Sequence, residues 1–340
     1  MSELPKYKIM EIEKIVDSVI QKNEIFKYNP YDCIELALGL VDKAWSMHLY
    51  YWYGGLEILV PLLLQNDTNS KTEPPIEKVA EALVLAQDYY FLRDYFYYSY
   101  NLQDAIKWKI ESENKIRIEI NRPSLPLQLF LELNNSFLGS RDFFLTPKFK
   151  KIEKRTETLV NTVEDEFSPS PNISQAYSLC FEEAKCRVDK QLMESFLSPN
   201  NSFDAYTVAQ FKEIYTHVLA RCILRRYFLK KREKKGEFVF PSCIIPNRNE
   251  FTDALAEATN ITKETVQIIL ADMTLDKFKS SKQLSISLFP LIHNPYEDLY
   301  YVFPNIVCFS HCFNGLRRLW ASKDPAKYGE EVAPHVLSLI

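Results

Sequence analysis

Apolar residues recur at helical spacing along most of the chain. Over residues 4–23, isoleucine and valine stand three or four positions apart, the pattern of a helix that buries one face. The pattern predicts three further helices, over 31–53, 56–64 and 76–102, with Asn29-Pro30 before the first and Pro74-Pro75 before the last. The last helix carries tyrosine and phenylalanine on all sides, so other elements must cover most of it.

The period changes from helical to two near residue 105. Isoleucine and tryptophan at 106, 108 and 110, and isoleucine at 116, 118 and 120, alternate with charged or polar residues. Alternation of this kind predicts a β-hairpin over about 105–121 with one apolar and one charged face. The segment Leu127–Leu138 returns to helical spacing.

The strongest break in the chain is Ser168-Pro169-Ser170-Pro171. We therefore expect a linker over 164–173 that joins an N-terminal helical domain, 1–163, to a C-terminal helical domain, 174–340. The second domain should contain helices over 174–197, 204–235, 249–258, 262–273 and 313–321. Gly236 and Thr262 are suited to end and to begin a helix, respectively.

Two apolar runs in the second domain predict strands. Leucine and isoleucine alternate with serine over 284–288, and Leu299-Tyr300-Tyr301-Val302-Phe303 is continuously apolar. These runs predict a second hairpin over about 284–303, and 238–240 is a further short strand. The expected fold is mainly α with two small β-hairpins (α+β), arranged as two helical domains or lobes.

Glycine is scarce, with 7 residues in 340. Phosphate-binding loops need several glycines within a few positions, because only glycine lets backbone N–H groups approach a phosphate closely. The adjacent pair Gly54-Gly55 lies inside an apolar run and interrupts it between two predicted helices. P-loop and Rossmann enzymes are therefore excluded, and the remaining glycines favour a helical scaffold without catalysis of its own.

The N-terminal residues lack the basic start and apolar core of a signal peptide, which indicates a cytoplasmic protein. The segment Trp45–Leu64 is long enough to span a membrane, but Glu57, Gly54-Gly55 and Pro61 interrupt it. We interpret it as a buried pair of helices and expect no membrane association. The apolar residues over 332–340 indicate either a docking tail or a chain that continues into another part.

Seven scattered cysteines indicate buried, reduced thiols, with no disulfide framework. Cys308, His311 and Cys312 could ligate zinc, but a structural zinc site needs four ligands and no second pair stands at suitable spacing. We expect no metal and no cofactor. No histidine stands in a local signature with a nucleophile, so we assign no catalytic residue.

One alternative is a metal-dependent nuclease of the PD-(D/E)xK type. Asp104 with Glu113-Asn114-Lys115 reproduces that spacing of carboxylates and lysine on the first hairpin. Glu113 and Lys115 fall in its turn, however, and Asp104 is only nine positions away, so the turn of a solvated hairpin is the better explanation.

A second alternative is an accessory that binds nucleic acid. Eight bases crowd the end of the helix over 204–235, where they could contact phosphates: Arg221, Arg225, Arg226, Lys230, Lys231, Arg232, Lys234 and Lys235. Cations at a helix C-terminus also complement its dipole, so a solvated helix end is the competing interpretation. The helices over 249–273 with the following hairpin are similar to a winged helix-turn-helix, although the expected reading helix offers a single base.

The order of elements from about residue 206 to the end resembles a known helical region. The matching motifs are Phe238-Val239-Phe240-Pro241, Leu270-Ala271-Asp272-Met273-Thr274-Leu275-Asp276, Pro290-Leu291-Ile292, Tyr301-Val302-Phe303-Pro304, Phe313-Asn314-Gly315-Leu316-Arg317-Arg318-Leu319 and Lys327-Tyr328-Gly329-Glu330-Glu331-Val332. They are similar to the region that precedes a restriction-endonuclease-like domain in large bacterial anti-phage-defence proteins. The sequence stops before the catalytic strands of that domain. The resemblance therefore implies a defence-type module without the catalytic part.

We accordingly expect a non-catalytic helical binding or regulatory module. Its partner would be another protein or a second copy of the chain, with nucleic acid as the alternative.

Overall fold

A computed structural model describes residues 22–47, 53–66, 70–101, 106–112, 115–120, 147–166, 169–195, 197–237, 243–245, 248–281, 285–308 and 310–331. This part of the chain is mainly helical with small sheets, which confirms the predicted fold class. Most of the predicted helix over 4–23, the helix over 127–138, the strand over 238–240 and the apolar stretch over 332–340 lie outside the described residues.

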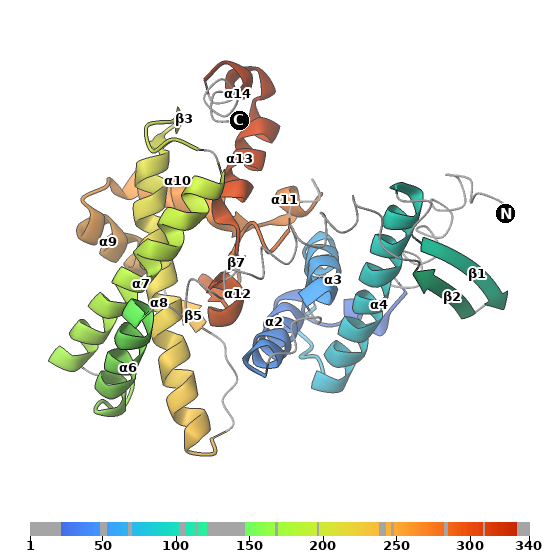
Figure 1. Cartoon of the computed structure of the whole chain (residues 1–340), viewed down its shortest axis with the longest axis horizontal. Coiled ribbons are helices and arrows are strands. Elements are labelled where there is room, and N and C mark those ends of the chain that lie inside the picture. The colour runs from blue at the N-terminus through green and yellow to red at the C-terminus, as the bar shows by residue number, and fades with distance from the viewer. Residues whose placement is uncertain are drawn as a thin grey trace.

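The N-terminal half forms a group of helices and the predicted first hairpin. Its elements are η1 (Glu24–Lys27), α2 (Pro30–Ser46), α3 (Tyr53–Gln65), α4 (Ile76–Asn101), β1 (Ile106–Ser112) and β2 (Lys115–Ile120). The strands pair antiparallel, with Ile106 opposite Ile120 and Trp108 opposite Ile118, which confirms the hairpin. Figure 1 shows the hairpin at the right of the view, beyond α4.

Gly54 and Gly55 allow α3 to approach α4 closely. They lie in the first turn of α3 and do not interrupt it, contrary to our expectation. A Cβ atom on Gly54 would lie 2.4 Å from the Tyr90 ring, and one on Gly55 would lie 2.8 Å from the Leu83 carbonyl oxygen. The apolar run over 45–64 is thus the end of α2 followed by the largely buried helix α3. Among the described residues, no helix has both the length and the apolar character needed to cross a membrane.

A second group contains three long helices that pack on one another. Its elements are α6 (Pro147–Asn161), α7 (Pro171–Ser195), β3 (Ser202–Phe203), β4 (Tyr206–Thr207) and α8 (Val208–Lys234). Sequence periodicity did not predict α6 or the small hairpin. α8 begins later than expected because Thr207 caps it, through a capping box with Gln210. Gly236 ends it at φ +78°, donating its N–H to the Glu233 carbonyl at 2.9 Å, which confirms the predicted cap.

The remaining elements form a sheet and a set of shorter helices. They are β5 (Cys243–Ile245), α9 (Arg248–Thr259), α10 (Lys263–Met273), β6 (Thr274–Leu275), α11 (Lys277–Ser281), β7 (Leu291–Asn294), β8 (Leu299–Val302), α12 (Pro304–Cys308), α13 (Cys312–Lys323) and α14 (Pro325–Glu331). Thr262 accepts a hydrogen bond from the Thr265 N–H, so it caps α10 as predicted.

The second hairpin differs from the predicted one. β7 and β8 form it, and the four-stranded sheet has the order β5-β8-β7-β6, with β6 parallel to β7. Residues 286–288, which we expected in a strand, form a turn in which Ser285 O accepts the N–H groups of Leu288 and Phe289 at 3.0 and 3.2 Å. The alternation there reflects a turn packed on one side, since Ile286 and Leu288 are buried whereas Ser285 and Ser287 are half-buried.

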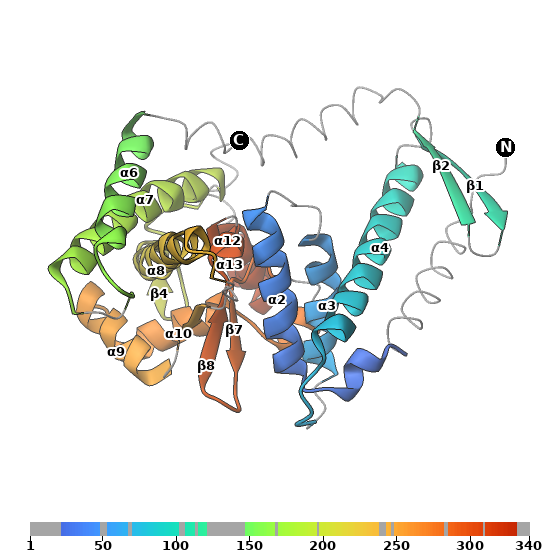
Figure 2. The same cartoon turned by 90° about the horizontal axis from the view of Figure 1, so that it is seen from below.

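This sheet separates two hydrophobic cores. Successive residues of β8 point to opposite faces: Tyr300 and Val302 join the core of α7, α8 and α10, and Leu299 and Tyr301 join the core of α2, α3 and α4. A strand buried on both faces has no polar positions to alternate with, which explains the continuous apolar run. Figures 1 and 2 show β7 and α12 between the helices α7 and α8 on one side and α2 and α3 on the other.

The cores do not divide at the predicted linker, residues 164–173. Val160, N-terminal to it, belongs to the core of α7 and α8, whereas Leu275 and Ile292, far beyond it, belong to the N-terminal core. Within the linker itself, Glu166 forms an ion pair with Arg225 of α8. Strand pairing brings distant segments together, and sequence breaks alone do not reveal it.

Candidate functional site

The end of α8 carries the eight bases that we predicted to contact nucleic acid, and half of them form ion pairs within the chain. The pairs are Arg225 with Glu166, Lys230 with Glu153 at 3.3 Å, Arg232 with Glu237 at 2.7 Å, and Lys234 with Glu157 at 3.9 Å. Arg221 and Lys235 are exposed and have no ion pair in the described part of the chain. Contact between α8 and nucleic acid stays a prediction. Because of these ion pairs, fewer bases of α8 are available to contact phosphates than the sequence suggested.

Lys231 holds the C-terminal end of α6. Its side chain is buried, and its Nζ donates to the carbonyl oxygens of Val160, at 3.1 Å, and Val163. Carbonyl groups at a helix end lack partners within the helix, and a cation satisfies them and complements the dipole. Lys231 therefore fastens α6 to α8.

We expect Lys231→Met to lower the free energy of unfolding by about 1–3 kcal/mol, because it leaves buried carbonyl groups without a donor. Lys235→Met, on the exposed end of the same helix, should change it by less than about 0.5 kcal/mol. Urea unfolding followed by circular dichroism measures both. Equal stability of the two variants would contradict the role assigned to Lys231.

The exposed basic surface lies on α6, the helix that periodicity missed. The segment Lys148-Phe149-Lys150-Lys151-Ile152-Glu153-Lys154-Arg155 holds five bases in eight residues, a signal that was visible in the sequence. Lys150, Lys151, Lys154 and Arg155 are exposed and form no ion pair within the described residues. At roughly 100° per residue they cover one continuous outer face of the helix, which we call the α6 basic face.

The acids of α6 border these bases, since Glu153 follows Lys150 and Glu157 follows Lys154 by three residues. Glu153 and Glu157, one turn apart, pair with Lys230 and Lys234, one turn apart on α8. Packing against α8 thus neutralises the inner charges of both helices. The outer face of α6 keeps an excess of positive charge.

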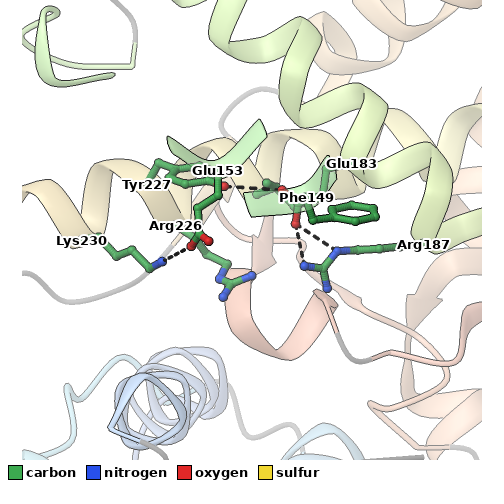
Figure 3. A pocket seen from close by; sticks show the side chains of 8 residues that line it. Phe149, Glu153, Glu183, Arg187, Arg226, Tyr227 and Lys230 are labelled. Carbon is green, nitrogen blue, oxygen red and sulfur yellow. Dashed lines mark hydrogen bonds and ion pairs between the residues drawn. The ribbon is translucent and has the colours of Figure 1, made fainter. Parts of the chain in front are cut away.

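A charged cavity of about 170 Å³ lies between α6, α7 and α8 (Figure 3). Its lining residues are Phe149, Glu153, Glu183, Arg187, Ile223, Arg226, Tyr227 and Lys230. Glu183 and Arg187 form a buried pair, with Glu183 Oε1 2.6 Å from Arg187 Nη2 and 3.1 Å from Nε. The Tyr227 hydroxyl donates to Glu183 Oε2 at 3.5 Å. Burial, and then the negative charge of Glu183, raise the pKa of Tyr227.

Arg226, another of the predicted bases, reaches this cavity. Its Nη1 lies 3.4 Å from the Sγ atom of Cys308 on α12. No carboxylate in the described part of the chain lies within ion-pair distance of its guanidinium. Figure 3 shows Arg226 among the lining side chains with no bond to either glutamate.

The other candidates from the sequence are not assembled into a described site. Asp104 and Glu113 lie outside the described residues, and Lys115 begins β2 without a described side chain. Cys308 and Cys312 are buried, and burial raises the pKa of Cys312. Among the described residues, no three histidine, cysteine, aspartate or glutamate side chains are placed to hold a metal ion.

The resemblance of α9 and α10 to a winged helix-turn-helix is also limited. The strand after α10 is β6, which is buried and pairs parallel with β7. The single base of the expected reading helix, Lys263, forms an ion pair with Asp253 at 2.6 Å.

Comparison with known proteins supplies no relative. No protein-family model matches the chain, no curated protein matches it, and no solved structure matches it.

Proposed function

We propose that this chain is a non-catalytic binding module and that the α6 basic face holds the phosphate backbone of a nucleic acid. The observation that carries the proposal is that α8 forms ion pairs with the acids of α6 and not with its exposed bases. Its acids are engaged by α8, whereas Lys150, Lys151, Lys154 and Arg155 face solvent without an ion pair among the described residues.

The geometry of the face suits a phosphate backbone. Bases separated by three or four residues lie on one side of a helix, about 5–6 Å apart, and present a row of positive charge. Lys231 and the ion pairs with α8 fix the helix that carries them. Because the helix is already fixed, only the side chains of the bases lose conformational entropy when they bind phosphates.

The surroundings of the face favour backbone contacts over other kinds of contact. The exposed large apolar side chains of the described residues are Met47, Ile76, Val84, Met193, Ile268, Phe278 and Tyr296, and none of these lies on α6. The face therefore has no described aromatic ring on which a base could stack and no apolar anchor for a lipid surface. We infer that it binds duplex nucleic acid without sequence preference.

The resemblance to a region that precedes a restriction-endonuclease-like domain in anti-phage-defence proteins agrees with this role. An accessory module that holds nucleic acid would supply affinity to a separate catalytic part. We propose in addition that the module contacts another protein or a second copy of this chain, as expected from the sequence.

The test is fluorescence anisotropy with a labelled 20-base-pair duplex of arbitrary sequence. We expect a slope of log K against log salt of about −3 to −4, because each of three or four phosphate contacts contributes about −0.9. Lys151→Glu with Lys154→Glu should weaken binding at least about tenfold at about 100 mM salt and reduce the slope by about 2.

The control is Lys277→Glu with Arg318→Glu, which changes the net charge equally at exposed positions on α11 and α13. It should leave the affinity within about twofold. Arg221→Glu with Lys235→Glu tests the two α8 bases that have no described ion pair. The proposal fails if no salt-dependent binding occurs, if the control weakens binding equally, or if anionic vesicles bind as tightly as the duplex.

A further inference from the structure

Arg226 places at the cavity between α6, α7 and α8 a positive charge that the carboxylates of Glu183 and Asp42 attract but that forms no ion pair among the described residues. A guanidinium keeps its charge at every accessible pH and has five N–H donors. The contact of Arg226 Nη1 with Cys308 Sγ uses one of them, and a thiol is a weak acceptor. A partly buried guanidinium without an ion-paired carboxylate retains part of its desolvation cost.

The other charges of the cavity are already matched. Arg187 is paired with Glu183 inside the cavity, and Lys230 is paired with Glu153 at its mouth. The charged lining residues therefore sum to one excess positive charge, and Arg226 is the lining base that has no ion pair among the described residues.

A carboxylate outside the lining, that of Asp42, has partners of its own. Asp42 lies close enough for Arg226 to lower its pKa, although burial raises that pKa more. It accepts hydrogen bonds from the backbone N–H groups of Asn305, at 2.7 Å, and Ile306, at 3.2 Å, and forms no ion pair with Arg226. Arg226 thus has donors available for a ligand.

Size and lining restrict what could occupy the cavity. Its volume of about 170 Å³ is below the range of roughly 300–1,000 Å³ for sites that hold drug-sized ligands and cofactors. Phe149 and Ile223 supply apolar walls. Glu153 and Glu183 would repel a second negative charge.

From these features we propose that the cavity binds a small monocarboxylate, with its carboxylate on the Arg226 guanidinium and its apolar body against Phe149 and Ile223. The planar fork of arginine matches both oxygens of a carboxylate. Lys230 at the mouth attracts the anion. This site is separate from the α6 basic face and does not depend on nucleic-acid binding.

Isothermal titration of the full chain with acetate, butyrate, benzoate and inorganic phosphate tests the proposal. We expect butyrate and benzoate to bind more tightly than acetate, because the apolar walls contribute to affinity, and at least about tenfold more tightly than phosphate. Arg226→Met should weaken butyrate binding at least about tenfold. Lys230→Met, at the exposed mouth, should weaken it by a smaller factor.

The matched control is Arg318→Met, at an exposed arginine of α13, which should leave the affinity unchanged. The proposal is overturned if no monocarboxylate binds at millimolar concentration, or if phosphate binds as tightly as butyrate. It is also overturned if the Lys230 variant and a folded Arg226 variant both keep the affinity of the control.

Discussion

Gly315→Ala is expected to lower the free energy of unfolding by about 3 kcal/mol, the upper end of the usual overpacking cost. A Cβ atom at this position would lie 2.4 Å from the Leu288 carbonyl oxygen and 2.9 Å from the Leu288 Cβ atom. The carbonyl is backbone, so rotation of a side chain cannot relieve the clash. α13 would have to move away from the turn over 286–288, although its Leu316 and Leu319 are buried in the two different cores.

Gly329→Ala is the matched control. Gly329 lies in α14, and a Cβ atom there would meet nothing within 4 Å. Alanine forms helices better than glycine, so this substitution should raise the free energy of unfolding by up to about 1 kcal/mol. Urea unfolding of both variants measures the difference, and equal stabilities would show that α13 does not contact the turn as described.

The second large effect is a pH-dependent one at Asp42, which joins α2 to α12. Its Oδ1 accepts the N–H groups of Asn305 and Ile306, at the start of α12, and its Oδ2 accepts the Asn305 side-chain amide at 3.1 Å. Burial raises the pKa of Asp42 to about 6, while the two backbone N–H groups lower it less. The effect of burial on the pKa of Asp42 therefore exceeds the opposite effect of its hydrogen bonds.

The sign of the effect follows from proton binding. The pKa of Asp42 is about 6 in the folded protein, whereas its ordinary value, which applies to the unfolded chain, is 3.8. Between these pH values the folded protein therefore binds more protons than the unfolded one. The free energy of unfolding should consequently fall by about 3 kcal/mol from this group alone as the pH rises through the interval. Below about pH 4 this contribution to stability is fully present.

Asp42→Asn removes this titration and keeps an acceptor for the two backbone N–H groups. As the pH rises from 4 to 7, the free energy of unfolding of the variant should increase by about 3 kcal/mol relative to that of the unmodified protein. Other buried acids titrate in both proteins, so the difference isolates Asp42. Asp42→Ala should be about 2 kcal/mol less stable than Asp42→Asn, because the N–H groups lose their acceptor.

Urea unfolding at pH values from 4 to 7 measures these differences. A constant difference between the protein and Asp42→Asn over this range would contradict the raised pKa. Equal stability of the Asn and Ala variants would contradict the capping of α12.

Some features of the chain follow from local sequence alone. The period of the apolar residues predicts most of the long helices and the hairpin β1–β2, since each depends on residues a few positions apart. Gly236 and Thr262 end and begin their helices as predicted, because capping needs only the cap residue and the adjacent turn.

The candidate sites show how far local sequence can go. The five bases of 148–155 are visible in the sequence, and so are the eight at the end of α8. Which of them face solvent depends on packing: α8 pairs with acids of α6 and of the adjoining turns, and Lys231 is buried against the end of α6. The cavity at Arg226 likewise exists only where three helices meet.

The sequence by itself therefore determined the helical character of the chain, its first hairpin and its helix caps. Only the tertiary structure decided that β7 and β8 are buried on both faces between two cores, and that four exposed bases of α6 form no ion pair among the described residues. The physical reason is that burial and ion pairing depend on residues far apart in the chain. Their effect on each side chain exceeds the local preferences that a sequence pattern expresses.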